Sequence, residues 1–119
     1  MSSLEQNIAS ANKYLERFRT TLTGHFIAGK PLIAADTETY SNLTPVDNTS
    51  LGDVVIGTEA DVDQACEAAA AAFDAWRDMP GAQRKKILHH FADKIVERAE
   101  EIALVESMDC GQPLSLIHI

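Results

Sequence analysis

The sequence predicts an α/β protein in which short antiparallel strands are followed by amphipathic helices. Between residues 25 and 56, short apolar stretches alternate with turn-forming glycine, proline and asparagine, which is typical of short strands. Between residues 58 and 110, apolar side chains recur every three or four residues, which is typical of one face of an α-helix. A chain of 119 residues has the size of one ordinary domain.

Residues 1–24 are predicted to form a leader helix. Its apolar residues are separated alternately by four and three positions, so they lie on one stripe of the helix. They are Leu4, Ile8, Ala11, Leu15, Phe18 and Leu22. We expect this stripe to pack against the rest of the chain, and the alternative is that it binds another protein.

The strands are predicted at three apolar stretches, Phe26–Ile27, Leu32–Ile33 and Val54–Ile56. The first two are expected to form a hairpin around Gly29–Pro31, because glycine tolerates a positive φ and proline has a fixed one. Thr44 is expected to be extended because it precedes a proline. A turn is also expected within residues 47–50.

A helix is predicted to begin at Thr58, a good N-cap residue followed by Glu59, Asp61 and Asp63, whose charges suit the positive end of the helix dipole. Its apolar face comprises Val62, Ala65, Cys66, Ala69, Ala72, Phe73 and Trp76. The sequence Met79-Pro80-Gly81 should end it.

A second helical run should follow, with a bend near Arg98, because an unbroken helix of about 25 residues would be long for a globular domain. Its apolar face comprises Ile87, Leu88, Phe91, Ala92, Ile95, Val96, Ala99, Ile102 and Ala103. Gly111, followed closely by Pro113, should end it.

The composition argues against several classes of partner. The net charge of −8 and the pI near 4.8 disfavour binding to nucleic acid or to an anionic membrane surface. The longest apolar run, Ala68–Phe73, is only six residues long and cannot cross a bilayer. Two cysteines do not make a disulfide framework, and we recognise no export signal, so we expect a cytoplasmic protein.

The residues that could carry chemistry are better explained as structural. Cys110 is predicted at a helix C-terminus beside Asp109, where negative potential disfavours the thiolate, and Cys66 is predicted on an apolar helix face. The neighbouring His89 and His90 point about 100° apart on a helix, so they cannot chelate one metal ion. No glycine-rich motif for binding phosphate or a dinucleotide occurs.

An ordered series of short motifs runs through residues 25–113. The motifs are His25–Lys30, Leu43–Pro45, Asp61–Ala65, Ala72–Phe73 with Trp76, Arg84 before Ile87–Leu88, Ala92–Asp93, and Glu106–Pro113. In their order and spacing they resemble the opening segment of the NAD(P)-dependent aldehyde dehydrogenase family. Two positions depart from the family pattern: Thr44 stands where asparagine is usual, and Gln112 stands where lysine is usual.

The resemblance implies that the chain is an N-terminal fragment of the aldehyde dehydrogenase fold. Residues 25–113 would be the N-terminal part of the cofactor-binding domain, and residues 114–119 are a candidate non-native tail. The complete enzyme would oxidise an aldehyde or semialdehyde to a carboxylic acid with NAD or NADP, and it would be a homo-oligomer. The family's catalytic residues lie outside this segment, so this chain is expected to be inactive and to bind no cofactor. The alternative is a small non-catalytic α/β interaction module.

The resemblance also implies one candidate metal site. Family members that hold a structural monovalent cation bind it with backbone carbonyls and with an aspartate, at the positions of Asn42, Leu43 and Asp109 here. Oxygen ligands suit hard cations. The alternative for Asp109 is an ordinary surface carboxylate at the end of a helix.

Overall fold

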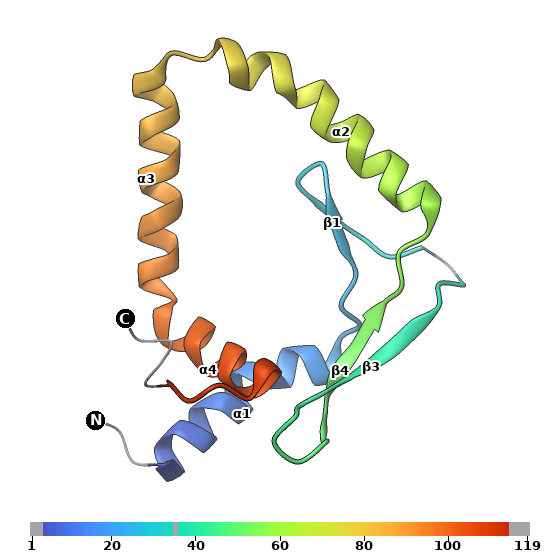
Figure 1. Ribbon diagram of the computed structural model, residues 1–119, viewed down its shortest axis with the longest axis vertical. Helices are drawn as coiled ribbons and strands as arrows, with labels where there is room; N and C mark the ends of the chain where they lie inside the picture. Colours follow the sequence, from blue (N-terminus) through green and yellow to red (C-terminus); the bar gives the residue numbers. More distant parts are fainter. Residues whose placement is uncertain (1–3, 35, 115–119) are drawn as a thin grey trace. The chain divides into compact units, whose positions relative to one another are not determined.

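The computed structural model describes residues 4–34 and 36–114 (Figure 1). It contains α1 (Leu4–Thr20), β1 (His25–Ile27), β2 (Lys30–Leu32), β3 (Thr39–Leu43), β4 (Ser50–Val55), α2 (Glu59–Asp78), α3 (Gly81–Glu97) and α4 (Ala99–Cys110). The prediction of an α/β fold with short strands and amphipathic helices is therefore confirmed. Most of the tail predicted at residues 114–119 lies outside the described residues.

The chain divides into two compact units. The first unit comprises Met1–Thr23, Thr39–Val54 and Arg98–Ile119, and the second comprises Gly24–Glu38 and Val55–Glu97. Each unit contains one two-stranded sheet, β3–β4 in the first and β1–β2 in the second. Within the described residues, no helix is long and apolar enough to span a membrane.

The first unit is built on the packing of α1 against α4. Ala11 and Leu15 of α1 are buried, as are Ala103 and Leu104 of α4. The ion pair between Arg17 and Glu101, 2.6 Å long, also joins the two helices. The expectation that the leader helix packs on its own chain is therefore confirmed for the middle of its stripe. Its first residues differ, because the side chains of Leu4 and Ile8 are exposed.

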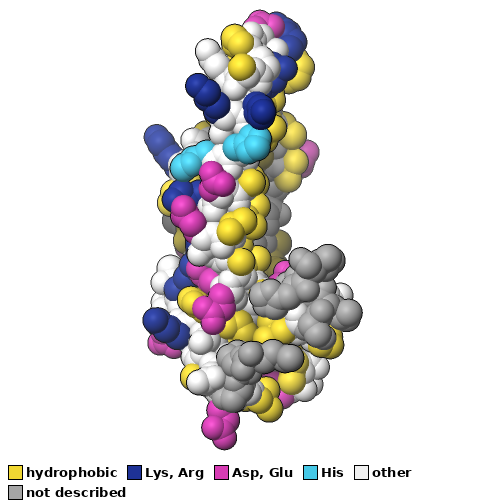
Figure 2. All heavy atoms as spheres, turned by 90° about the vertical axis from the view of Figure 1, so that its left-hand side faces the viewer, with side chains coloured by type: hydrophobic (Ala, Val, Ile, Leu, Met, Phe, Trp, Pro, Cys, Tyr) yellow, Lys and Arg dark blue, Asp and Glu magenta, His cyan; other side chains and the backbone are white. Residues whose placement is uncertain are grey.

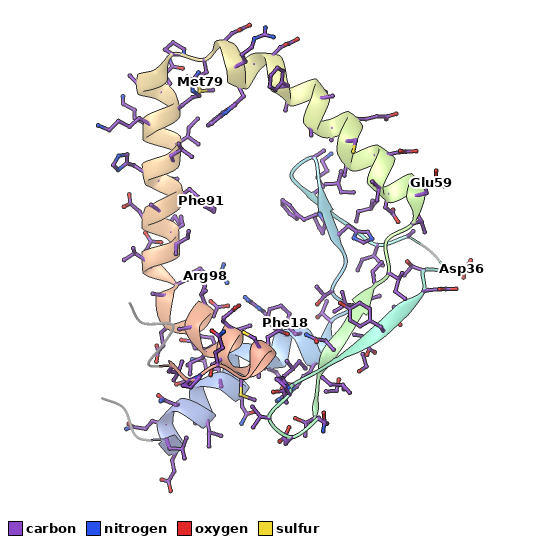
Figure 3. All side chains as sticks on the ribbon, viewed as in Figure 1. Phe18, Asp36, Glu59, Met79, Phe91 and Arg98 are labelled. Carbon is purple, nitrogen blue, oxygen red and sulfur yellow. The ribbon has the colours of Figure 1, made fainter. Side chains whose placement is uncertain are left out.

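The hairpin β3–β4 completes the first unit, and Leu51 of β4 is part of its core. The backbone comes close to α1 at Gly52, which has a φ of 133°. A Cβ atom at this position would lie 2.1 Å from the carbonyl oxygen of Phe18, near the end of α1 (Figure 3). Only glycine fits there without moving the backbone of the helix.

The second unit begins with the hairpin β1–β2, in which Ile27 pairs with Lys30 and His25 with Leu32. The predicted hairpin exists, but its predicted turn is displaced toward the N-terminus. Ala28 and Gly29 form the two-residue turn, with φ values of 52° and 77°. Two positive φ values match the twist of a tight hairpin, whereas the proline ring requires a negative φ. Pro31 therefore lies in β2 rather than in the turn.

The helix α2 starts as predicted. Thr58 is its N-cap, and its hydroxyl accepts a hydrogen bond from the backbone N–H of Asp61, while the carboxylate of Asp61 accepts one from the backbone N–H of Thr58. This reciprocal capping satisfies two N–H groups that the helix leaves unpaired.

The predicted helix breaks are also confirmed. Met79 is the C-cap of α2, Arg98 separates α3 from α4, and Gly111 ends α4 with a φ of 70°. The guanidinium of Arg84 in α3 donates to the carbonyl oxygens of Trp76 and Arg77 at the end of α2. The arginine thus satisfies carbonyls that have no partner within their own helix.

Candidate functional site

The most distinctive polar cluster lies where the C-terminal end of α4 meets β3, within the first unit. The side-chain amide of Asn42 donates to the carboxylate of Asp109 over 2.6 Å. The buried hydroxyl of Thr44 donates to the carbonyl oxygen of Met108. The structure therefore brings two of the three predicted metal-site residues, Asn42 and Asp109, into contact. The third, Leu43, follows Asn42 directly and its side chain is exposed.

The electrostatics of this helix end favour positive charge. The last carbonyls of a helix carry a partial negative charge, and the carboxylate of Asp109 adds a full one. The backbone N–H of Gly111 satisfies the carbonyl of Ser107, and Thr44 satisfies that of Met108. Asn42 offers the carboxylate only a neutral amide donor. A cation at this helix end would interact more strongly with the Asp109 carboxylate than the neutral amide of Asn42 does.

A half-open cavity of about 220 Å³ lies beside the same cluster. Its walls are largely apolar and include Leu15, Phe18, Leu51, Val54 and Val105, with Asn42 and Asp109 also lining it. The lining also includes the hydroxyl residue Thr23, and Asp109 is the one ionisable residue among the described residues that line the cavity.

Cys110 lies in the same region, and its surroundings disfavour the thiolate. Its Sγ donates to the backbone carbonyl oxygen of Glu106 over 2.9 Å and lies 3.2 Å from the carboxylate of that residue. The hydrogen bond to Glu106 raises the pKa of Cys110, and desolvation and the charges of Glu106 and Asp109 add to the shift. A raised pKa means less thiolate at neutral pH. The pKa of Cys110 is shifted in the predicted direction, and the absence of an activated nucleophile at this position stays a prediction.

The other candidate residues are separated from one another. Cys66 lies on α2 and is exposed, and His89 and His90 are exposed on α3. Within residues 4–34 and 36–114, no three His, Cys, Asp or Glu side chains are grouped closely enough to hold a metal ion. A cation at the end of α4 would therefore depend on backbone and amide oxygens together with one carboxylate.

One contact was not predicted from the sequence. Nε2 of His25, in β1, lies 3.7 Å from the carboxylate of Asp61, in the first turn of α2. The bonds from the backbone and the hydroxyl of Thr58 lower the pKa of Asp61, and the charge of His25 contributes less. The contact joins the β1–β2 hairpin to α2. Both residues belong to the motifs that carry the family resemblance, but their spacing in sequence gives no sign that they meet.

Comparison with known proteins decides the family. The model of the aldehyde dehydrogenase family matches residues 32–118. The chain belongs to the aldehyde dehydrogenase family.

Individual aldehyde dehydrogenases show the same relationship. The NADP/NAD-dependent aldehyde dehydrogenase PuuC of Escherichia coli is 36% identical over 91 residues, which are 75% of this chain and 18% of PuuC. The N-succinylglutamate 5-semialdehyde dehydrogenase of Chromobacterium violaceum is 39% identical over 89 residues, with the same shares of the two chains. The crystal structure of HpcC from Thermus thermophilus matches 92% of this chain and 21% of its own, with a TM-score of 0.87 and 33% identity.

This aldehyde dehydrogenase chain therefore spans about a fifth of the length of the curated relatives that it matches. The structure also explains one of its departures from the family pattern. Thr44 stands where asparagine is usual, and its hydroxyl supplies the hydrogen bond that closes the end of α4. Nothing in the structure explains Gln112.

Proposed function

We propose that this chain is the scaffolding N-terminal part of an oxidoreductase that converts an aldehyde or semialdehyde to a carboxylic acid with NAD or NADP. The family match over residues 32–118 carries this proposal. The names of the relatives support it, because PuuC is described as NADP/NAD-dependent and the Chromobacterium relative as a semialdehyde dehydrogenase.

The chemistry of aldehyde oxidation supports a purely structural role for this segment. Aldehyde oxidation requires a nucleophilic thiolate and a base that activates water, and a bound nicotinamide would supply the hydride acceptor. The two thiols of this chain, Cys66 and Cys110, are both exposed, and the pKa of Cys110 is raised. We therefore infer that the nucleophile lies elsewhere in the complete enzyme, and that residues 25–113 form the N-terminal part of its cofactor-binding domain.

The isolated chain is expected to neither oxidise aldehydes nor bind NAD or NADP. The test is to incubate the purified chain with either cofactor and a panel of aliphatic and aromatic aldehydes, and to follow the absorbance of the reduced nicotinamide. Cofactor binding is measured separately by calorimetry. PuuC serves as the positive control under the same conditions. Turnover above that of a heat-treated sample, or saturable binding of either cofactor, would contradict the proposed role.

We also propose that Asp109 and the backbone carbonyls of Asn42 and Leu43 contribute to a monovalent cation site. Asn42 and Asp109 are in contact, and the site lies at the negative end of α4, so a hard cation fits both the donor set and the local potential. When bound, the cation would neutralise the carboxylate and tie β3 to α4.

The cation site predicts that sodium or potassium raises the melting temperature of the chain relative to choline at equal ionic strength. At a cation concentration about ten times the Kd, the gain is about 1.4 kcal/mol. The Asp109→Asn variant should lose this difference, because it removes the only charged ligand. The Leu43→Ala variant should keep the difference, because the backbone carbonyl remains. Equal melting temperatures in all three salts would argue against the site.

A second candidate function is that of a non-catalytic interaction module. The observation in its favour is that α2 and α3 contain no buried residue, although both carry large apolar side chains.

A further inference from the structure

The imidazole of His25, at the start of β1, has a buried nitrogen without a hydrogen-bond partner. Among the described residues that are not exposed, Nε2 of His25 is the only buried side-chain nitrogen or oxygen in this condition. The side chain as a whole is 25% exposed. A buried polar atom without a partner is unfavourable, because the water that it has lost is not replaced. The groups around Nε2 therefore decide how the ring responds to a proton.

Two groups enclose this nitrogen, and both belong to the second unit, as His25 does. A Cβ atom at Gly57 would lie 3.3 Å from Cε1 of the ring and 3.6 Å from Nε2, so the backbone before α2 lies close to this edge of the imidazole. Oδ2 of Asp61, in the first turn of α2, lies 3.7 Å from Nε2 (Figure 3). A shift of about 0.8 Å would bring the two atoms to hydrogen-bonding distance.

The carboxylate of Asp61 is held in place by the cap of α2. Its Oδ2 accepts hydrogen bonds from the backbone N–H of Thr58 over 2.8 Å and from the Thr58 hydroxyl over 2.7 Å. These bonds lower the pKa of Asp61, so the carboxylate keeps its charge at a pH at which histidine gains a proton. The ring of His25 thus faces a fixed negative charge.

No second charged group contacts the ring within the part of the chain that the structure describes. The other charged side chains on the segments next to β1 are Lys30 on β2, Glu59 and Asp63 in the first two turns of α2, and Glu38 before β3. Lys30 pairs with Ile27, at the opposite end of the hairpin from His25. Asp61 is therefore the charge that determines how protonation of His25 affects the contact.

We propose that His25 and Asp61 form a proton-dependent clasp that fastens the β1–β2 hairpin to the first turn of α2. A neutral imidazole has one N–H, at either nitrogen, whereas an imidazolium has an N–H at both. Protonation therefore ensures a donor at Nε2 and places a positive charge opposite the carboxylate, and hydrogen bonds between charged groups are stronger than those between neutral ones.

The pH dependence of the clasp follows from the two charges. The clasp is complete where the imidazole is protonated and Asp61 is ionised. It weakens as the pH rises and His25 loses its proton, which histidine ordinarily does between about pH 5 and 8. It weakens again at strongly acidic pH, where Asp61 is protonated, and the lowered pKa of Asp61 moves that limit to lower pH.

A double-mutant cycle isolates the contribution of the pair. His25→Gln keeps a donor but cannot gain a proton, and Asp61→Asn keeps an acceptor for Thr58 but carries no charge. The free energy of unfolding of the original chain, of both variants and of the double variant is measured by urea titration with circular dichroism, at about pH 5.5 and about pH 8. The coupling, expressed as a ratio of unfolding equilibrium constants, should be about threefold larger at the lower pH.

His89→Gln is the matched control for the loss of a titrating ring. His89 is exposed on α3, and Figure 2 shows histidine side chains at the surface of the face that includes this helix. This variant should change the unfolding equilibrium constant by the same factor at both pH values, because in the described part of the chain no carboxylate forms an ion pair with His89.

Hydrogen exchange in the original chain tests the clasp without any substitution, so the test holds even where a variant does not fold. Protection of the β1 and β2 amides, corrected for the intrinsic exchange rate at each pH, should be about threefold higher at the lower pH. Equal protection at the two pH values, or a coupling that does not change with pH, would overturn the proposal. A coupling that grows as the pH rises would also overturn it, because desolvation of the imidazolium would then outweigh its attraction to Asp61.

Discussion

Replacing Gly52 by alanine is expected to unfold the first unit. The new Cβ would lie 2.1 Å from the carbonyl oxygen of Phe18 and 2.7 Å from its carbonyl carbon, and both belong to the backbone of α1. A backbone cannot move aside as a flexible side chain can, and the φ of 133° is itself unfavourable for alanine. We expect a loss on the order of 3–5 kcal/mol in the free energy of unfolding, measured by urea titration with circular dichroism.

The matched control is Gly29→Ala. Gly29 also has a positive φ, 77°, but a Cβ there would meet no atom within 4 Å. This variant experiences the unfavourable backbone conformation without the collision, so it should lose only about 1 kcal/mol. Equal losses in the two variants would show that the close approach of Gly52 to α1 does not limit stability.

Shortening Leu15 to alanine should release α1 from α4. The Leu15 side chain is 1% exposed and is one of the largest fully buried side chains among the described residues. Removing such a side chain from a core lowers the free energy of unfolding by about 2–5 kcal/mol. Buried apolar area is lost, and the cavity that is left closes only in part. The first unit already has a cavity of about 220 Å³ next to Leu15, so the substitution enlarges an existing gap.

Leu4→Ala is the matched control for this second variant, because Leu4 is on the same helix stripe but 74% exposed. Its expected loss is within about 0.5 kcal/mol. Hydrogen exchange on amides of α1 should accelerate strongly in the Leu15 variant and hardly at all in the Leu4 variant. Similar exchange rates in both would mean that α1 is held by its ion pair with α4 rather than by the buried stripe.

Local chemistry made the helix boundaries predictable from the sequence. The helix ends depend on backbone angles and on contacts within one helical turn, so a short stretch of sequence is enough to predict them. This holds for Thr58, for the Met79–Gly81 break and for Gly111. The strand β3 was missed because it is polar and its residues are mostly exposed. Its structure depends on pairing with β4, which no short stretch of sequence shows.

The candidate cation site was predictable only through the family resemblance. Asn42 and Asp109 are 67 positions apart, and no periodicity connects a strand end with a helix end over that distance. The contact of His25 with Asp61 was missed for the same reason. By contrast, the raised pKa of Cys110 could be anticipated, because its causes, Glu106 and Asp109, lie within one helical turn of the thiol.

The interleaving of the two units has a consequence for synthesis on the ribosome. The second unit consists of two segments that are close in sequence, whereas α1 can pack only after α4 has been synthesised. The hydroxyl of Tyr14, for example, donates to the carboxylate of Glu100, which is 86 positions away. Closing a loop of that length lowers the entropy of the chain before the stabilising contacts have formed. Contacts between residues far apart in sequence therefore slow folding. The nascent leader helix therefore keeps Leu15 uncovered until α4 has been synthesised.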